Sequence, residues 1–316
     1  MRSQKSIDPE VYAVASMFPE VNFADANGTR ALFSAMLQAA APAGGPAFDP
    51  GIAQLERVIP SLNGGPDVPI RIYTPATRTS MSPAYVSFHG GAFILGDLDT
   101  EHARCLKMSL DGNAVVVAVD YRLAPENAFP AGVEDCYSAL HWVASNAPML
   151  GIDPTKIVVG GSSAGGALAA AVALMARDRS GPSIAMQMLF YPVIDDRGLT
   201  ESMKTGHDAL AWNSRNVRDM WAHYLGAERS ETSPYAAPGR ATDLANLPSA
   251  YVVTCEHDPL RDEGLEYAAR MLQSGVSVEL HNYAGTVHGF DLLIPNASVS
   301  IRALDDAVAA FQRATK

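Results

Sequence analysis

Near the middle of the chain stands an apolar, β-branched run that passes directly into small residues: Lys156-Ile157-Val158-Val159-Gly160-Gly161-Ser162-Ser163-Ala164-Gly165. The run predicts a buried strand, and the Ala-rich segment 164–178 that follows it predicts a helix. The residues between them fit the pattern G-x-S-x-G, which exposes a serine on a sharp turn when a strand precedes it and a helix follows. We therefore predict that Ser163 is a nucleophile.

Two competing interpretations of this turn stay open. In the first, Ser162 is the nucleophile, but its flanks are Gly160 and Ala164. Only Ser163 has a glycine two residues away on both sides, where a tight turn leaves no room for a side chain. In the second, the segment is a glycine-rich turn at a helix start that binds phosphate or nothing.

Predicted strands and helices alternate on both sides of this turn. The predicted strands cover residues 68–73, 84–88, 114–119, 156–159, 184–191, 250–255 and 277–283. The predicted helices between and after them cover residues 132–145, 164–178, 263–272 and 299–313. This alternation predicts an α/β fold with a mostly parallel central sheet flanked by helices.

Two segments depart from the alternation. Residues 1–50 contain two predicted helices and a linker-like stretch at 41–46, and residues 195–235 contain polar turns with one predicted helix. Parallel sheets place their sites at the carboxyl ends of the strands. We therefore expect both segments to form a helical cap there, over a core made of residues 51–194 and 236–316.

A second glycine-rich turn, His89-Gly90-Gly91-Ala92-Phe93, follows the predicted strand 84–88. It matches the H-G-G-x loop that supplies backbone N–H groups to an oxyanion. Fixed donors of this kind stabilise the negative charge of an acyl-transfer transition state by roughly 3 kcal/mol each. The predicted donors are Gly90, Gly91 and Ala164. A plain glycine turn at a strand end is the competing interpretation, and His89 is expected to be structural.

A serine nucleophile needs an imidazole base, which in turn needs a carboxylate to fix its tautomer. His288 follows the predicted strand 277–283, and Asp258 follows the predicted strand 250–255. The order Ser, Asp, His along the chain is the one expected for this arrangement. We predict Asp258 and His288 as the partners of Ser163. The weaker candidates are His257, His281, Asp262 and Asp291.

Composition limits the possible function further. The chain has 316 residues with a net charge of −11, which disfavours nucleic acid and anionic membranes as partners. Three widely spaced cysteines, Cys105, Cys136 and Cys255, predict no disulfide framework and no metal site, and they favour a cytoplasmic setting. No apolar stretch reaches the length of about 18 residues expected of a membrane helix.

The sequence resembles the bacterial hormone-sensitive-lipase-like esterases (esterase family IV) of the α/β-hydrolase superfamily. The matching stretches, in the family's order, are His89–Phe93, Asp120–Glu126, Phe129–Ala131, Glu134–Asp135, Gly161–Gly166, Asp258–Glu263 and His288–Phe290. Two positions depart from the family's pattern. Ser162 stands where Asp or Thr is usual, and Ala92 stands where a third glycine is usual, which leaves the subfamily and the acyl preference open.

The resemblance implies an α/β-hydrolase fold with a helical cap, and hydrolysis of a small-molecule carboxylic ester of short or medium acyl chain without a cofactor. It also implies a possible homodimer. The walls of the substrate pocket are expected from the cap, Phe93 and Tyr191. The same triad could instead act on amides, lactones or carbamates, or transfer acyl groups. A receptor-like protein that binds ligand without turnover is a further hypothesis.

Overall fold

The computed structural model describes residues 6–40, 49–78, 81–226 and 231–316, so the expected linker at 41–46 lies outside the described residues. In the described part of the chain, eight strands form one sheet in the order β1-β2-β4-β3-β5-β6-β7-β8. The β1–β2 and β2–β4 pairs are antiparallel, and the pairs from β4 to β8 are parallel. The predicted fold class, a mostly parallel sheet flanked by helices, is confirmed.

The elements have the following bounds. The strands are β1 (Ile52–Ile59), β2 (Val68–Pro75), β3 (Ser82–Phe88), β4 (Val115–Val119), β5 (Ile152–Ser162), β6 (Met186–Phe190), β7 (Ser249–His257) and β8 (Val278–Val287). The helices are α1 (Pro9–Ala15), α2 (Ala26–Ala40), α3 (His102–Leu110), α4 (Ala131–Ser145), α5 (Ala147–Leu150), α6 (Ala164–Asp178), α7 (Glu201–Thr205), α8 (Ser214–Leu225), α9 (Arg261–Gln273), α10 (Phe290–Leu293) and α11 (Ser298–Ala314). Two short 3-10 helices cover Gly206–Asp208 and Pro238–Arg240.

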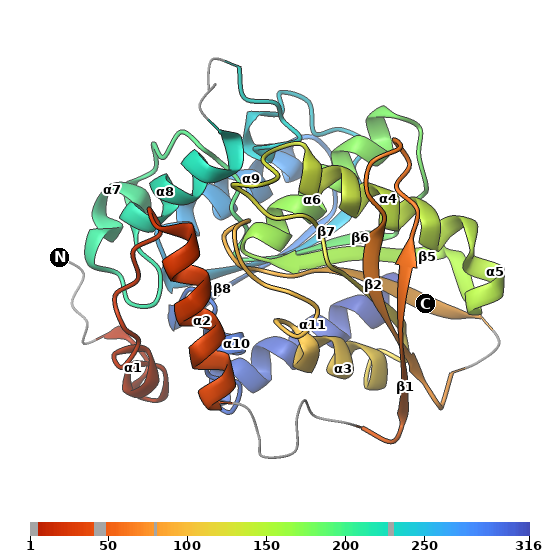
Figure 1. The fold of residues 1–316 in the computed structure, drawn as a ribbon, viewed down its shortest axis with the longest axis horizontal. Helices are drawn as coiled ribbons and strands as arrows, with labels where there is room; N and C mark the ends of the chain where they lie inside the picture. Colours follow the sequence, from red (N-terminus) through yellow and green to blue (C-terminus); the bar gives the residue numbers. More distant parts are fainter. Residues whose placement is uncertain (1–5, 41–48, 79–80, 227–230) are drawn as a thin grey trace.

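The core lies on both faces of the sheet, because successive side chains of a strand point to opposite faces. In β4, Val116 contributes to one hydrophobic cluster and Val117 to the other. The cluster that contains Val116 includes side chains of α11. The cluster that contains Val117 includes side chains of α4, α6 and α9. Figure 1 shows the same layers, with α3 and α11 below the sheet and α4, α6 and α9 above it. No helix in the described residues is long and apolar enough to span a bilayer.

The two segments expected to form a cap differ in what they contact. The helix α1 is capped by Asp8, whose side chain accepts from the N–H groups of Glu10 and Val11. It docks on the core, since the Asp8 N–H donates to the carbonyl of Gly285 in β8 at 2.9 Å. The chain after α1 reaches the second segment, where Nε2 of His223 in α8 lies 2.9 Å from the carbonyl of Phe23.

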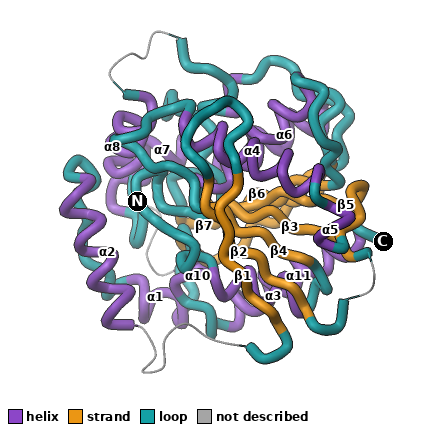
Figure 2. Tube along the Cα trace, turned by 45° about the vertical axis from the view of Figure 1, so that its right-hand side comes forward, coloured by secondary structure: helices purple, strands orange, loops and turns teal. Residues whose placement is uncertain are grey.

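Helices α2, α7 and α8 lie at the same end of the molecule in two views, Figure 1 and Figure 2. The helix α8 corresponds to the one predicted in residues 195–235, and it begins where Asn213 accepts from two N–H groups of its first turn. The ion pair between Arg30 of α2 and Glu126 (2.7 Å) fastens α2 to the loop that follows β4. Arg30 also donates to the carbonyls of Ile94 and Ala124, so α2 is tied to the loops at the strand ends.

Candidate active site

Three side chains from separate strand ends meet in one hydrogen-bonded line. Nε2 of His288 lies 2.9 Å from Oγ of Ser163, and Nδ1 of His288 lies 2.7 Å from Oδ2 of Asp258. A carboxylate can only accept here, so Nδ1 carries the proton and Nε2 is left to accept the serine proton. Asp258 is held in place by a second bond, from the N–H of Leu260 to its Oδ1 at 2.9 Å. The arrangement can therefore withdraw a proton from Ser163.

Ser163 stands in a strained turn between β5 and α6. Its backbone has φ 53° and ψ −115°, a conformation that a side-chain-bearing residue adopts at a cost of about 1–3 kcal/mol. The flanking glycines make the turn possible. A Cβ on Gly161 would lie 2.1 Å from the carbonyl oxygen of Phe88, and one on Gly165 would lie 1.9 Å from the same atom. This turn, residues 161–165, is called the Ser163 elbow below. It therefore packs directly against the end of β3.

Ser162, the competing nucleophile, points away from the base. Its hydroxyl donates to Oε1 of Glu101, which is a buried carboxylate on the far side of the turn. Of the two serines, Ser163 is the one that contacts His288. The sequence pattern distinguishes the two adjacent serines only by their flanking glycines. The structure distinguishes them by the hydrogen-bond partners of their hydroxyls.

The weaker candidates for the base and its orienting carboxylate are engaged elsewhere. His257 lies 3.1 Å from the hydroxyl of Ser6, and His281 lies 2.9 Å from Glu279. Asp262 accepts from the N–H of Ser202 at 2.7 Å. These bonds leave His288 and Asp258 as the pair that reaches Ser163.

The expected oxyanion donors, the N–H groups of Gly90, Gly91 and Ala164, lie in the loop after β3 and at the start of α6. The N–H of Gly90 donates to Oε1 of Glu101 at 2.9 Å, so it is occupied and is not a free donor. This corrects the expectation for Gly90. In the described part of the chain, no hydrogen bond uses the N–H groups of Gly91, Ala92 or Ala164. Ala92, which has φ 56°, is therefore a further candidate donor beside Gly91 and Ala164.

His89 supports this loop, as expected. Its Nδ1 lies 2.7 Å from the carbonyl of Gly90, and its ring stacks on Tyr121 at a centroid distance of 4.2 Å. The hydroxyl of Tyr121 donates to the carbonyl of His89 at 2.7 Å. Burial lowers the pKa of His89 below its usual value, which keeps the ring neutral. His89 is thus a brace and not an acid or a base.

Aromatic side chains pack against the imidazole of His288. The ring of Trp212 stacks on His288 with centroids 5.7 Å apart, and Phe23 packs edge-on against Trp212 at 4.8 Å. Phe93 stacks on Tyr224 of α8 at 3.8 Å. As a result Ser163 is only 8% exposed and His288 only 9%. No sequence pattern pointed to Trp212, because its position over the imidazole depends on how residues 195–235 fold onto the sheet end.

Tyr191, expected as a pocket wall, has a different position. Its hydroxyl donates to Oδ1 of Asp291 at 2.7 Å and lies 3.1 Å from Nη2 of Arg104, in a buried polar cluster. Its ring packs edge-on against His288 with centroids 4.9 Å apart. Because the hydroxyl is used behind the imidazole, Tyr191 braces His288 and does not offer a polar group to a substrate.

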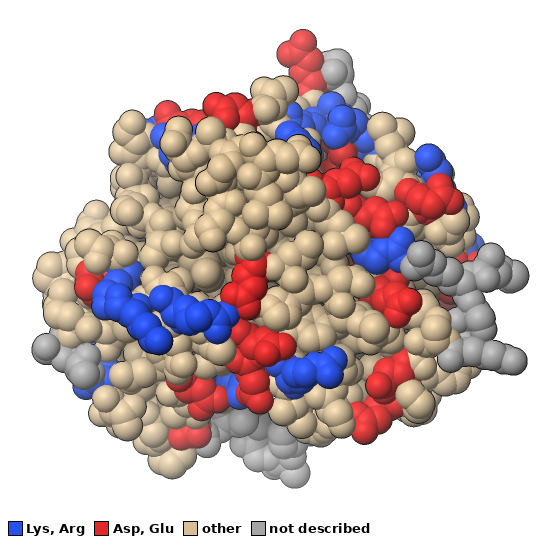
Figure 3. All heavy atoms as spheres, turned by 180° about the vertical axis from the view of Figure 1, so that it is seen from behind, with Lys and Arg blue, Asp and Glu red and all other residues tan. Residues whose placement is uncertain are grey.

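Charge on the surface is mixed in sign. Figure 3 shows basic and acidic side chains interspersed on one face, next to a broad area without either. Among the described residues many charges pair at the surface, for example Arg313 with Glu279 at 2.5 Å. The net charge of −11 disfavours nucleic acid and anionic membranes as partners, and this stays a prediction.

Comparison with known proteins indicates the family to which the chain is related. A family model described as the alpha/beta hydrolase fold matches residues 85–292. The carboxylesterase NlhH of Mycobacterium tuberculosis is 38% identical over 319 residues, covering 99% of this chain and 97% of that protein. An arylesterase of Saccharolobus solfataricus is 41% identical over 225 residues, covering 71% of this chain and 73% of that protein. The solved structure of a bacterial heroin esterase has a TM-score of 0.94 and 42% identity, with 99% of both chains covered.

Proposed function

Because this chain belongs to the α/β-hydrolase fold family, we propose that it is a carboxylic ester hydrolase with Ser163 as its nucleophile. The observation that carries the proposal is the unbroken line of hydrogen bonds from Ser163 through His288 to Asp258. Relatives named carboxylesterase, arylesterase and heroin esterase support ester chemistry among the reactions that this fold can host. They also fit the resemblance to the hormone-sensitive-lipase-like esterases.

The reaction proceeds in two halves. Nε2 of His288 takes the hydroxyl proton of Ser163 as Oγ attacks the ester carbonyl, and Asp258 stabilises the imidazolium that forms. His288 then gives this proton to the departing alkoxide oxygen, which leaves an acyl group on Ser163. A water molecule attacks the acyl-enzyme with His288 again as the base, and the carboxylic acid is released.

The negative charge of the tetrahedral intermediate is held by backbone donors. The free N–H groups of Gly91, Ala92 and Ala164 lie on the two segments that flank the elbow. Ala164 is the first residue of α6, so the positive end of the helix dipole adds to its N–H. Donors fixed in advance in a dry site cost no reorganisation when the charge appears, which makes them effective in the transition state.

The enclosed site favours small substrates. Ser163 and His288 are nearly buried under aromatic side chains of the cap, so a short acyl chain fits more readily than a long one. Phe93 is the proposed wall on the acyl side, since it is stacked on α8 next to the free donors. The cap is proposed to comprise residues 1–50 and 195–235, and the core residues 51–194 and 236–316.

The proposal is tested by hydrolysis of p-nitrophenyl esters from acetate to laurate, with the matching anilide and a lactone as comparisons. The wild-type chain is expected to hydrolyse the acetate and butyrate fastest. Ser163→Ala is expected to lower kcat by about 10⁶-fold while the melting temperature stays close to that of the wild type. The matched control is Ser298→Ala, which alters an exposed serine at the start of α11 and leaves turnover unchanged.

Ester hydrolysis by Ser163→Ala at more than a hundredth of the wild-type rate would refute the assignment of the nucleophile. Faster hydrolysis of the anilide or the lactone than of every ester would refute the substrate class.

A further inference from the structure

A buried ionic network lies directly behind the catalytic residues. Arg104 of α3 is 1% exposed, and it pairs with Glu101 at 2.7 Å through Nη1 and with Asp291 at 2.7 Å through Nη2. Both carboxylates are buried as well. The guanidinium also lies over the ring of Phe190 at 4.3 Å. We refer to Glu101, Arg104 and Asp291 as the α3 network.

One end of the α3 network holds the two loops that form the reaction centre. Oε1 of Glu101 accepts from the N–H of Gly90 at 2.9 Å and from the hydroxyl of Ser162. Gly90 immediately precedes Gly91, and Ser162 immediately precedes Ser163. The loop of residues 89–93, which supplies the proposed oxyanion donors, is called the oxyanion loop below. A single carboxylate oxygen therefore links the oxyanion loop to the Ser163 elbow.

The opposite end of the α3 network reaches the base. Asp291 comes three residues after His288, and its Oδ1 accepts a hydrogen bond from the Tyr191 hydroxyl at 2.7 Å. The ring of Tyr191 packs edge-on against the imidazole of His288. Arg104 thus connects, through one guanidinium, the oxyanion loop, the elbow and the loop that carries the base.

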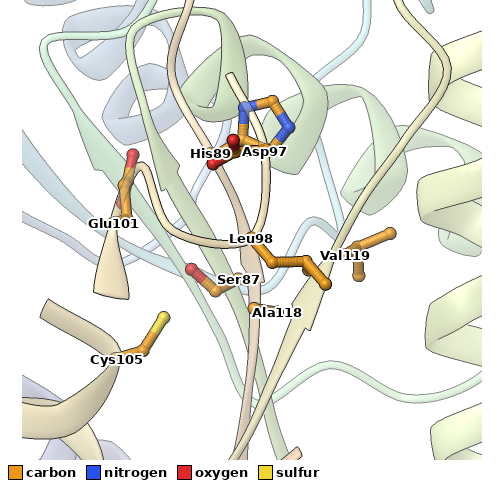
Figure 4. Close-up of a pocket in the computed structure, with 8 residues that line it drawn as sticks. All are labelled: Ser87, His89, Asp97, Leu98, Glu101, Cys105, Ala118 and Val119. Atoms are coloured by element: carbon orange, nitrogen blue, oxygen red, sulfur yellow. The ribbon is translucent and has the colours of Figure 1, made fainter. Parts of the chain in front are cut away.

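Side chains do not completely fill the space behind the oxyanion loop. A small cavity of about 10 Å³, room for about one water molecule, lies behind the loop and is lined by Ser87, His89 and Glu101 among others (Figure 4). Ser163, Asp258 and His288 do not line it. Figure 4 shows Glu101 among the residues that line this cavity, and Glu101 is the residue immediately before α3.

Stability alone does not explain such a network. Buried ionic groups lose their hydration, and apolar residues of similar volume often replace them without loss of stability. Arg104 is the only cation of the α3 network, and it pairs with two carboxylates. Its N–H groups can only donate and the carboxylate oxygens can only accept, so the direction of each hydrogen bond is fixed. Charge-assisted bonds of this kind are short and directional, which suits a positioning role.

We propose that Glu101, oriented by Arg104, is a positioning residue that sets the distance between the oxyanion loop and the Ser163 elbow. Glu101 accepts hydrogen bonds from both the Gly90 N–H and the Ser162 hydroxyl. This leaves the N–H groups of Gly91, Ala92 and Ala164 to point at the oxyanion of the tetrahedral intermediate. The inference rests on the proposed ester hydrolysis. It adds a residue that acts on the transition state through the backbone, without touching the substrate.

The test is Glu101→Gln, which keeps the size of the side chain and removes its charge. We expect kcat for p-nitrophenyl acetate to fall by about 10- to 100-fold with KM within about twofold of the wild type, because the donors act mainly on the transition state. The affinity for a trifluoromethyl ketone, whose adduct with Ser163 carries an oxyanion, is expected to fall by the same factor as kcat/KM.

The matched control is Asp135→Asn. Asp135 is also a buried carboxylate paired with an arginine, Arg122 at 2.8 Å, but it lies on α4 and contacts neither the elbow nor the oxyanion loop. This variant is expected to lose stability and to keep the wild-type kcat and inhibitor affinity. Ser162→Ala provides a second test if Glu101→Gln fails to fold, since it removes one bond to Glu101 and leaves the α3 network intact. Its kcat is expected to fall by about three- to tenfold at constant KM.

The outcomes separate the two proposals. A wild-type chain that hydrolyses no ester and binds no ketone would refute the proposed function. An active wild type whose Glu101→Gln and Ser162→Ala variants keep full kcat and full inhibitor affinity would overturn the positioning role alone. An equal loss of kcat in Asp135→Asn would also overturn it, because the effect would then follow from any broken buried ion pair.

Discussion

Gly165→Ala is the substitution for which the structure gives the most definite expectation. A Cβ at this position would lie 1.9 Å from the carbonyl oxygen of Phe88 and 2.6 Å from that of His89. Ordinary contacts between carbon and a carbonyl oxygen are about 3.3 Å, so the two segments must move apart by about 1.4 Å. Both neighbours are backbone atoms at the end of β3, and they cannot rotate away as a side chain would.

This displacement separates the oxyanion loop from the nucleophile. A misplacement of about 1 Å in a catalytic arrangement costs about 100-fold in rate, so kcat is expected to fall by at least about 100-fold, close to 2.7 kcal/mol. Overpacking is expected to lower the free energy of unfolding by about 1–3 kcal/mol.

The assay combines kcat and KM for p-nitrophenyl butyrate with a urea titration of the free energy of unfolding. The matched control is Gly65→Ala, where the nearest atoms are the ends of flexible side chains, Ser61 Oγ at 3.2 Å and Arg122 Nη2 at 3.6 Å. A Gly165→Ala variant with kcat within threefold of the wild type would refute the reasoning, because the elbow would then not press against β3.

Three further predictions concern the triad, the acyl wall and the cap. Asp258→Asn is expected to lower kcat by about 10⁴-fold, because an amide can favour the wrong tautomer of His288; a loss below tenfold in the same ester assay would contradict the assigned role. Phe93→Ala is expected to lower the free energy of unfolding by about 3–5 kcal/mol in a urea titration and to raise kcat/KM for the octanoate relative to the acetate, and an unchanged ratio would remove Phe93 from the acyl wall. The hydrogen bond from Arg30 lowers the pKa of Glu126 to about 2, so its ion pair stabilises the fold above pH 4.5 and is lost as the pH falls through 2. Glu126→Gln is therefore expected to lower the free energy of unfolding by at most about 1 kcal/mol at pH 7, in a urea titration, and by less at pH 3.5; a difference that grows on acidification would contradict the pairing.

Much of the fold could be predicted because its strands are buried on both faces. The run Val115–Val119 and the apolar part of β5 are continuous apolar segments rich in β-branched residues. Such runs indicate buried parallel strands without any knowledge of their neighbours. The strand β1 was not predicted. It is an edge strand in which only Ile52 and Ile59 are buried, so its sequence carries no regular alternation. The helix α3 was also not predicted, because its buried face includes a charged residue, Arg104.

The candidate triad could be predicted because each of its members directly follows a strand. The carboxyl ends of parallel strands meet at one edge of the sheet, so local position in the sequence implies proximity in space. The contribution of Glu101 could not be predicted in this way. Its bonds to Gly90 and Ser162 depend on how α3 docks against the sheet, and a lone glutamate at a helix start is usually a solvated one. The hydrogen bond between the Tyr191 hydroxyl and Arg104 could not be predicted either, because it also depends on how α3 docks against the sheet.

The central claim is that His288 activates the hydroxyl of Ser163 and not that of the adjacent Ser162. It is tested most directly by treating the protein with diisopropyl fluorophosphate, which reacts with activated serines, and locating the adduct by peptide mass spectrometry. We predict one phosphoryl group per chain, attached to Ser163, with no labelling of the His288→Ala variant. An adduct on Ser162, or labelling of Ser163 at an equal rate in the absence of the imidazole, would contradict this claim.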